Sequence, residues 1–137
     1  MGHAIQPADI RKVYRHILPG LVDIIEKTNA EWWPEDIYAD CKHGKAFLYT
    51  QVDDPQNFVV LELHECPYRG HKILWVLAAY SVENDAFEWC RHEVERLGAE
   101  AGCDYISFAS PRKGWEKLAT FAGYEAGITH YKKALNR

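Results

Sequence analysis

The chain has 137 residues, with 16 Lys and Arg against 20 Asp and Glu and a formal net charge of −4. This length predicts a single domain with one core, spanning residues 1–137. The basic residues are scattered along the chain, which argues against nucleic acid or an anionic membrane as the main partner, because both need clustered Lys and Arg.

Two further features of the sequence concern the cellular location of the protein. No apolar run approaches the roughly 18–20 residues that a membrane helix needs, and the N-terminus lacks the pattern of a signal peptide. The cysteines are far apart, unlike the dense disulfide framework of a small secreted domain. They are Cys41, Cys66, Cys90 and Cys103. We therefore expect a cytoplasmic protein with reduced thiols and no membrane contact.

The first third of the chain has a helical pattern. Apolar residues recur at steps of three and four between Ile10 and Ile25, and Asp9 is a suitable N-cap. Pro19 cannot continue an undisturbed helix, so we expect a break there and a second helix that begins at Pro19. A further short helix is predicted from Pro34 to Cys41.

The middle of the chain predicts a sheet. Residues 45–52 alternate, residues 53–57 form a turn cluster, and residues 58–64 are again apolar and β-branched. A second turn at residues 67–70 leads into Lys72–Tyr80, whose apolar run suits a central strand with Trp75 in the core. The short connections predict three consecutive antiparallel strands.

The last third predicts alternating helices and strands. A long helix from Ala86 to Ala101 is followed by a strand at 104–109, a helix at 114–122 and a strand at 127–133. A right-handed crossover makes the 104–109 strand parallel to its predecessor in the sheet. The predicted fold class is α/β, a mixed sheet with helices on both faces.

This order of elements resembles the GNAT (N-acetyltransferase) superfamily over nearly the whole chain. Leu118–Tyr124, followed by Tyr131-Lys132, is similar to the family's last helix and closing strand, and Ile17–Val22 is similar to its first helix. More narrowly, Gly102–Asp104 and Arg112–Glu116 resemble small GNAT-like proteins of tailed bacteriophages, some of them internal virion or assembly proteins. That resemblance implies the host cytoplasm or the virion as the location.

The resemblance implies acetyl-CoA as cofactor, with its pyrophosphate held by a loop of pattern Arg/Gln-x-x-Gly-x-Gly/Ala before the long helix. The backbone candidates for that role are Val82, Glu83, Asn84, Asp85 and Ala86. Only Ala86 fits the pattern. Glu83 and Asp85 suit a helix N-terminus, by roughly 0.3–1 kcal/mol each, but repel a bound pyrophosphate by a few kcal/mol if the site is partly dehydrated. We favour a capped helix without a cofactor, although backbone N–H groups do most of the binding in such loops.

The family's general acid is commonly a Tyr on the last helix, and the matching position here is Ala119, which cannot donate a proton. Tyr124 is a substitute candidate, although packing is the favoured interpretation. For a general base, Glu62 and His64 share one strand face by the period of two and could act as base and partner. The solvent face of a hairpin is the favoured interpretation of that pair.

Other side chains in the sequence bear on metal binding and on contact surfaces. The Cys-x-His and His-x-Cys pairs do not match the ligand spacing of zinc sites, so no metal is expected. The tryptophans at element ends suit either contacts with a partner or lids over the core, and they are Trp32, Trp33 and Trp115. Arg112 and Lys113 precede a predicted helix and could take an anion or a partner carboxylate, but two solvated charges are favoured.

Two functions follow. We favour a GNAT-fold protein with a degraded acyl-CoA site, non-catalytic, acting on a protein partner or a second copy in phage virion assembly or host interaction. The alternative is an acyl-CoA-dependent N-acetyltransferase with a divergent pyrophosphate loop, using Glu62 or His64 as base and a bound water as proton relay. A cleft beside the Lys72–Tyr80 strand that is open, rather than filled by Phe87 and Trp115, would favour the alternative.

Overall fold

The fold is an α/β arrangement around one mixed sheet. The computed structural model describes residues 4–82, 86–108, 123–124 and 133–135. The elements in chain order are β1 (Ile5–Pro7), α1 (Ile10–Thr28), α2 (Pro34–Lys42), β2 (Phe47–Gln51), β3 (Asp54–Glu65), β4 (Lys72–Tyr80), α3 (Ala86–Glu100) and β5 (Tyr105–Phe108). The helix expected at 114–122 lies outside the described residues, as does all but the last residue of the strand expected at 127–133.

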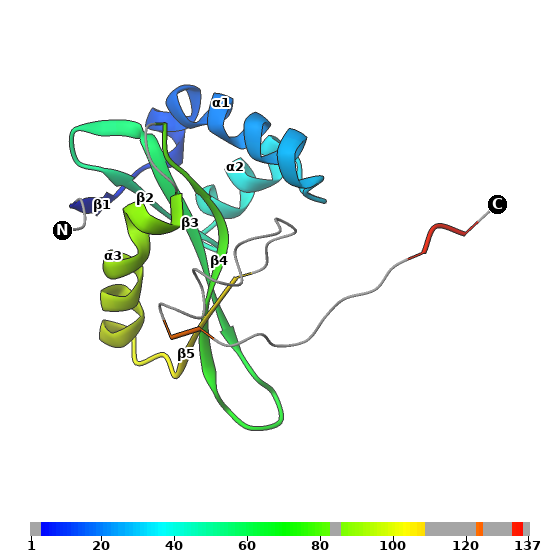
Figure 1. Ribbon diagram of the computed structural model, residues 1–137, viewed down its shortest axis with the longest axis vertical. Coiled ribbons are helices and arrows are strands. Elements are labelled where there is room, and N and C mark those ends of the chain that lie inside the picture. The colour runs from blue at the N-terminus through cyan, green and yellow to red at the C-terminus, as the bar shows by residue number, and fades with distance from the viewer. Residues whose placement is uncertain (1–3, 83–85, 109–122, 125–132, 136–137) are drawn as a thin grey trace.

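The five strands are ordered β1-β2-β3-β4-β5. Neighbours from β1 to β4 are antiparallel, and β5 runs parallel to β4, which confirms the predicted meander and crossover strand. Figure 1 shows α1 and α2 on one face of this sheet and α3 on the other.

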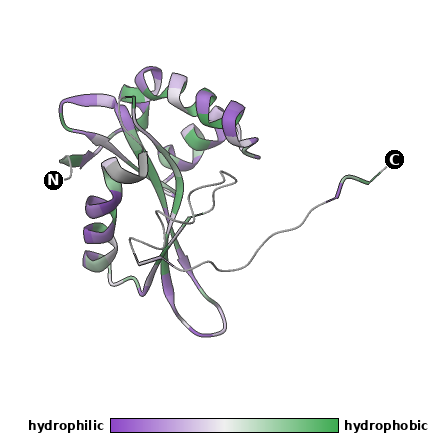
Figure 2. Cartoon of the chain, viewed as in Figure 1, coloured by the Kyte–Doolittle hydropathy of each residue, from purple (hydrophilic) through white to green (hydrophobic). Residues whose placement is uncertain are grey.

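Both faces of the sheet are covered by helices, because β3 carries apolar side chains on both of its faces. Phe58 and Val60 belong to the core beneath α1 and α2, while Val59 and Leu61 belong to the core beneath α3. Side chains alternate between faces along a strand, so a continuous apolar run feeds both cores. Figure 2 shows the hydrophobic colour concentrated in the central strands and the hydrophilic colour on the helices.

The break expected at Pro19 is wrong, because α1 continues unbroken through this residue. Asp9 caps it as predicted, its carboxylate accepting from the Arg11 N–H at 3.0 Å. Pro within a helix costs about 3 kcal/mol. Ile17 and Leu21, on either side of Pro19, are both 0% exposed. Burying each contributes about 1.5–3 kcal/mol, which offsets that cost and keeps the helix on the sheet.

The prediction that Trp75 lies in the core is also wrong. Its side chain is half-buried and stacks on His64, with ring centroids 6.1 Å apart. The helices of its face pack instead against the other half of β4, at Leu77, Ala78 and Tyr80. Among the tryptophans that the structure describes, Trp89 of α3 is the buried one, with 2% exposure.

The short strand β1 was not predicted. It pairs with β2 at the edge of the sheet, from Ile5 opposite Gln51 to Pro7 opposite Tyr49. Three residues are too few to show a period of two. An edge position also tolerates Pro7, which has no N–H to donate to a further strand.

The close approach of α1 to the sheet depends on Gly20. A Cβ atom at this position would lie 2.7 Å from the Tyr80 ring and 2.8 Å from the Phe58 ring, which are both held in the core. We expect Gly20→Ala to lower the free energy of unfolding by about 1–3 kcal/mol, since overpacking forces these rings to move. Urea-induced unfolding measures the difference.

The matched control is Gly98→Ala, at another buried helical glycine. A Cβ atom there would lie 3.4 Å from the Ile106 side chain, an ordinary contact. We expect this variant to be neutral or up to about 1 kcal/mol more stable, because Ala favours helix over Gly. Equal effects of the two substitutions would contradict the proposed role of Gly20.

Candidate functional site

The site that the resemblance implies lies where β4 ends and α3 begins. Of the backbone candidates, Val82 and Ala86 are described, while residues 83–85 lie outside the described part of the chain. The Val82 N–H donates to the side-chain oxygen of Asn57, with a nitrogen-to-oxygen distance of 2.8 Å. A backbone donor of the loop is therefore bonded to the protein itself.

Asn57 belongs to a network of buried amides that sequence reasoning missed. It is 6% exposed, and its Nδ2 donates to the Gln51 Oε1 atom at 2.8 Å. The same oxygen accepts from the Trp89 indole N–H at 3.0 Å. The network thus joins β2, β3 and the early part of α3 to the loop that precedes α3.

A break in strand pairing puts Asn57 in this position. Thr50 lies opposite Phe58, but the next residue, Gln51, lies opposite Asp54. Residues 55–57 are therefore extra on the β3 side, as in a bulge, and the Asn57 amide comes within reach of Gln51. The sequence carries one signal that could have found it, a polar residue directly before the buried run that begins at Phe58.

A second pairing shift lies in β4, beside the place where a cleft to β5 was expected. Val60 lies opposite Ala78 and Leu61 opposite Val76, so Leu77 is an extra residue. Within the described residues, β5 pairs with β4 from Ile73 to Val76, and the bulge follows at once. Bulges bend the strand that carries them, so β4 changes direction at Leu77, directly after the residues that pair with β5. The side chains of Phe87 and Trp115 lie outside the described residues, so whether they fill this space is untested.

The candidate bases lie together on the face that α1 and α2 cover. Glu62 and His64 share this face, with 3.5 Å between Oε1 and Nε2. Glu62 is opposite Trp75 in the ladder, and the indole of Trp75 stacks on the His64 ring. The side chain of Glu62 is 24% exposed and that of His64 is 50% exposed.

Cys41 of α2 is near the same carboxylate. Burial, with the Asp40 and Glu62 carboxylates as further causes, raises the pKa of the Cys41 thiol to about 11. The thiol therefore stays protonated at neutral pH and is a poor nucleophile. Cys41 also lines a depression of about 180 Å³ beside β1 and β2, most of whose other lining residues are apolar.

The candidate acid, Tyr124, lies on the opposite side of the sheet. Its hydroxyl donates to the Glu95 Oε2 atom of α3 at 3.2 Å, and its ring meets Phe108 edge-on at 5.4 Å. Burial first, and then the Glu95 carboxylate, raises the pKa of Tyr124 above its usual range. The structure therefore does not bring Tyr124 together with Glu62 and His64.

The candidate contact residues differ in exposure. Trp32 packs against the core beneath α1 and α2, whereas Trp33 is 67% exposed at the start of α2. The Trp33 N–H donates to the Asp36 carboxylate at 2.8 Å, which fixes the backbone that carries the exposed ring. The remaining candidates lie outside the described residues, and they are Arg112, Lys113 and Trp115, together with Ala119.

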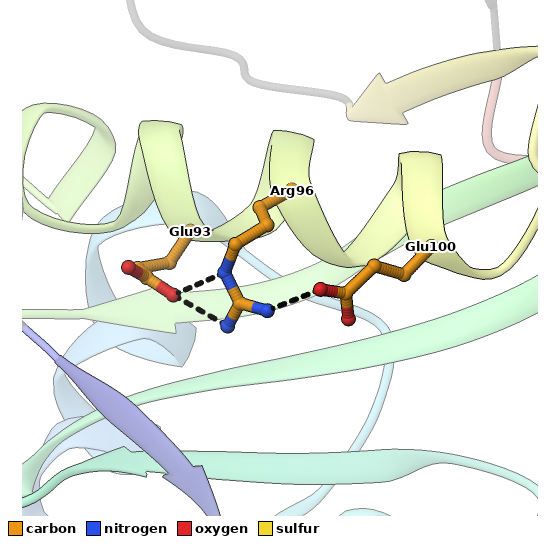
Figure 3. A network of polar contacts seen from close by, with 3 residues as sticks. All are labelled: Glu93, Arg96 and Glu100. Atoms are coloured by element: carbon orange, nitrogen blue, oxygen red, sulfur yellow. Dashed lines mark hydrogen bonds and ion pairs between the residues drawn. The ribbon is translucent and has the colours of Figure 1, made fainter.

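The outer surface of α3 carries a network of charged side chains, in which one arginine forms ion pairs with two glutamates of the same helix. Figure 3 shows Arg96 between two carboxylates, with Nε and Nη2 donating to Glu93 and Nη1 donating to Glu100. These hydrogen bonds raise the pKa of Arg96, which keeps it charged. This guanidinium is paired with acidic neighbours of its own helix.

The described part of the chain has neither a metal-binding cluster nor a membrane-spanning helix. Its His, Cys, Asp and Glu residues include no group of three that could hold a metal ion. None of the helices in those ranges is both long and apolar enough to cross a membrane.

Comparisons with known proteins support the fold. No family model and no curated protein matches the sequence. A solved structure of a probable acetyltransferase has a TM-score of 0.70 at 12% identity, covering 98% of this chain and 99% of the other. A putative acetyltransferase from Pyrococcus furiosus has a TM-score of 0.68 at 12% identity, with 96% and 100% covered.

A third similar structure is a ribosomal-protein-alanine N-acetyltransferase from Brucella melitensis biovar Abortus 2308. Its TM-score is 0.66 at 12% identity, and the match covers 100% of both chains. Identities this low establish the fold and not the activity. The chain has the GNAT-like α/β fold that the order of elements predicted.

The environment of Tyr124 predicts a specific loss of stability at alkaline pH. A tyrosine in the unfolded chain ionises near pH 10, whereas the raised pKa keeps Tyr124 protonated in the folded chain. Its contribution is therefore complete below about pH 10 and is lost as the pH rises further. We expect Tyr124→Phe to make the fall in unfolding free energy between pH 9.5 and 11.5 shallower.

Urea unfolding at several pH values measures this effect. Tyr68→Phe is the control, because the Tyr68 side chain is 94% exposed and its variant should retain the wild-type profile. A Tyr124→Phe profile parallel to that of the wild type would show that the hydroxyl is not held as described.

Proposed function

We propose that this chain is a GNAT-fold protein that does not bind acyl-CoA and acts through protein contacts. The observation that carries the proposal is the hydrogen bond from the Val82 N–H to Asn57. Loops that bind pyrophosphate do so through backbone N–H groups at the start of a helix. Here Val82, which precedes the start of α3 at Ala86, donates its N–H to the side chain of Asn57, which is 6% exposed.

Charge supports the same conclusion. The sequence puts Glu83 and Asp85 between this donor and the start of α3. Two carboxylates favour a helix N-terminus but oppose an anion with two phosphate charges at the same place.

The separation of the candidate catalytic groups also supports a non-catalytic role. Glu62 and His64 lie on the face of α1 and α2, whereas the Tyr124 hydroxyl bonds to α3. General acid and base catalysis requires both groups within hydrogen-bond reach of one substrate. With Ala119 at the family's acid position, no proton donor is assigned to the departing thiolate.

For the contact itself, Trp33 is the described residue best suited to a partner. Large aromatic side chains are enriched at protein interfaces, and the Trp33 side chain is 67% exposed on a fixed backbone. The resemblance of Arg112–Glu116 to small phage proteins supports a role in virion assembly or host interaction, in the host cytoplasm or the virion. Arg112 and Lys113 would then contact carboxylates of the partner.

One observation favours a second candidate function. The extra residue Leu77 bends β4 where the described β5 pairing ends, which is a backbone arrangement suited to admitting a ligand between the two strands. In that case the protein would be an acyl-CoA-dependent N-acetyltransferase with Glu62 or His64 as base and a water relay. Solved structures of the same fold include acetyltransferases.

Calorimetry with acetyl-CoA separates the two functions. We expect no binding heat at sub-millimolar concentration and no thermal shift. A ligand at ten times its Kd stabilises a protein by about 1.4 kcal/mol, which raises Tm by several degrees. Such a shift would overturn the proposal.

If binding occurs, transfer of the acetyl group to an amine is measured next. Loss of that turnover in Glu62→Gln, with the affinity for acetyl-CoA unchanged, would establish the second function. The matched control is Glu65→Gln, an exposed carboxylate at the end of the same strand.

A further inference from the structure

The outer surface of α1 carries a row of exposed residues at the spacing of a contact between two helices. The residues of this row recur at steps of three and four, and all are exposed, whereas Ile17 and Leu21 on the inner surface are 0% exposed. Steps of three and four align residues along one side of a helix, which is the pattern by which helices pack side by side. This outer row of α1 consists of Lys12, Arg15, Pro19, Val22 and Glu26.

The charges along α1 are arranged symmetrically about Pro19, with opposite signs on its two sides. Lys12 lies seven residues before Pro19, and Glu26 lies seven residues after it. Arg15 lies four residues before Pro19, and the partly exposed Asp23 lies four residues after it. Two antiparallel copies of this helix, related by a twofold axis at Pro19, therefore place each of these basic residues opposite an acidic one.

This order of charges is opposite to the one that a helix favours by itself. The N-terminus of a helix favours acidic side chains, and the C-terminus favours basic ones, because of the helix dipole. The first turn of α1 contains Lys12 and no acidic residue, while Glu26 lies in its last turn. The helix that carries these two residues thus favours neither of them, whereas an antiparallel second copy brings them together.

The ion pairs within α1 leave three of its charges for a second copy. Arg11 is paired with Asp9 at 3.0 Å, and Lys27 is paired with Asp23 at 2.9 Å. The remaining Lys, Arg, Asp and Glu residues of α1 form no ion pair in the described part of the chain, and they are Lys12, Arg15 and Glu26. All three belong to the outer row.

We propose that the outer row of α1 binds a second copy of this chain, in an antiparallel pair with a twofold axis at Pro19. Lys12 faces Glu26 of the second copy, and Pro19 and Val22 form a small apolar centre. Exposed ion pairs supply most of the attraction, so the dimer is weak and is sensitive to salt. This contact goes beyond the proposed function, because it does not depend on whether the chain binds acyl-CoA.

Charge reversal in the full chain tests the pairing. Lys12→Glu and Glu26→Lys each put like charges opposite one another at two places in the dimer, so each variant alone should dimerise at least about tenfold more weakly than the wild type. A mixture of the two variants has opposite charges at both places. It should therefore form a heterodimer with about the affinity of the wild-type dimer. Sedimentation over a series of concentrations at low salt, with one variant carrying a fluorescent label, measures these affinities.

The matched controls are Lys45→Glu and Glu65→Lys, which make the same changes in net charge at exposed residues outside α1 and should leave dimerisation unchanged. The helix dipole favours both substitutions in α1, so neither should lower Tm, and weaker dimerisation is then not a consequence of unfolding. In about 1 M salt, where the Debye length is about 3 Å, the wild-type chain should be monomeric.

A wild-type chain that stays monomeric at millimolar concentration and low salt would overturn the proposal. Single variants that dimerise as tightly as the wild type would do the same, because the copies would then associate through another surface. The absence of a heterodimer in the mixture would show that Lys12 and Glu26 do not face one another.

Discussion

The structure depends on the two-sided burial of β3. Its four successive residues Phe58, Val59, Val60 and Leu61 are between 0% and 1% exposed. A strand of this kind is stable only if both faces are covered, because each exposed apolar side chain would forfeit about 1.5–3 kcal/mol. The need to cover both faces places α1 and α2 on one side and α3 on the other, and it brings Gly20 against the rings of Phe58 and Tyr80.

Because residues 58–61 are buried on both faces of β3, the polar side chains of this strand lie before and after them. Strand pairing shifts between Thr50 and Gln51 before it and between Val60 and Leu61 within it. The first shift brings the Asn57 amide beside the start of α3, and the second bends β4 at Leu77. Glu62 and His64 follow directly after the buried residues. The position of the Asn57 amide and the bend of β4 are therefore both consequences of how β3 is paired.

Sequence patterns predicted the elements whose apolar pattern is long, although β3 begins at Asp54, within the turn expected at residues 53–57. The bounds of β4 agree with the expectation at Lys72 and Tyr80, and the long helix ends one residue before the expected Ala101. The errors at Pro19 and Trp75 share one cause. Local propensity describes a residue by its neighbours in the chain, whereas burial depends on which helix lies across the sheet. Pro19 is tolerated because α1 is held by the sheet, and Trp75 is half-buried because α1 and α2 pack on the other half of β4.

The amide network could not be predicted for a similar reason. An Asn, a Gln and a Trp at positions 57, 51 and 89 have no meaningful spacing until the pairing shift in β2 and β3 is known. Only their mutual hydrogen bonds show that they act together. The effect of Glu83 and Asp85, by contrast, could be predicted from the sequence, because a carboxylate is charged whatever residues lie near it in the fold.

The exclusion of an anion from this loop, as we propose it, rests on two obstacles that differ in their physical character. Repulsion by the carboxylates of Glu83 and Asp85 acts through space and is screened by salt, with a Debye length of about 8 Å at physiological ionic strength. The Asn57 acceptor acts through a hydrogen bond at 2.8 Å from a residue that is 6% exposed, where mobile ions do not enter. Raising the ionic strength therefore weakens the first obstacle and leaves the second. A loop closed by charge alone would regain anions in concentrated salt, whereas a loop closed by a buried amide stays closed.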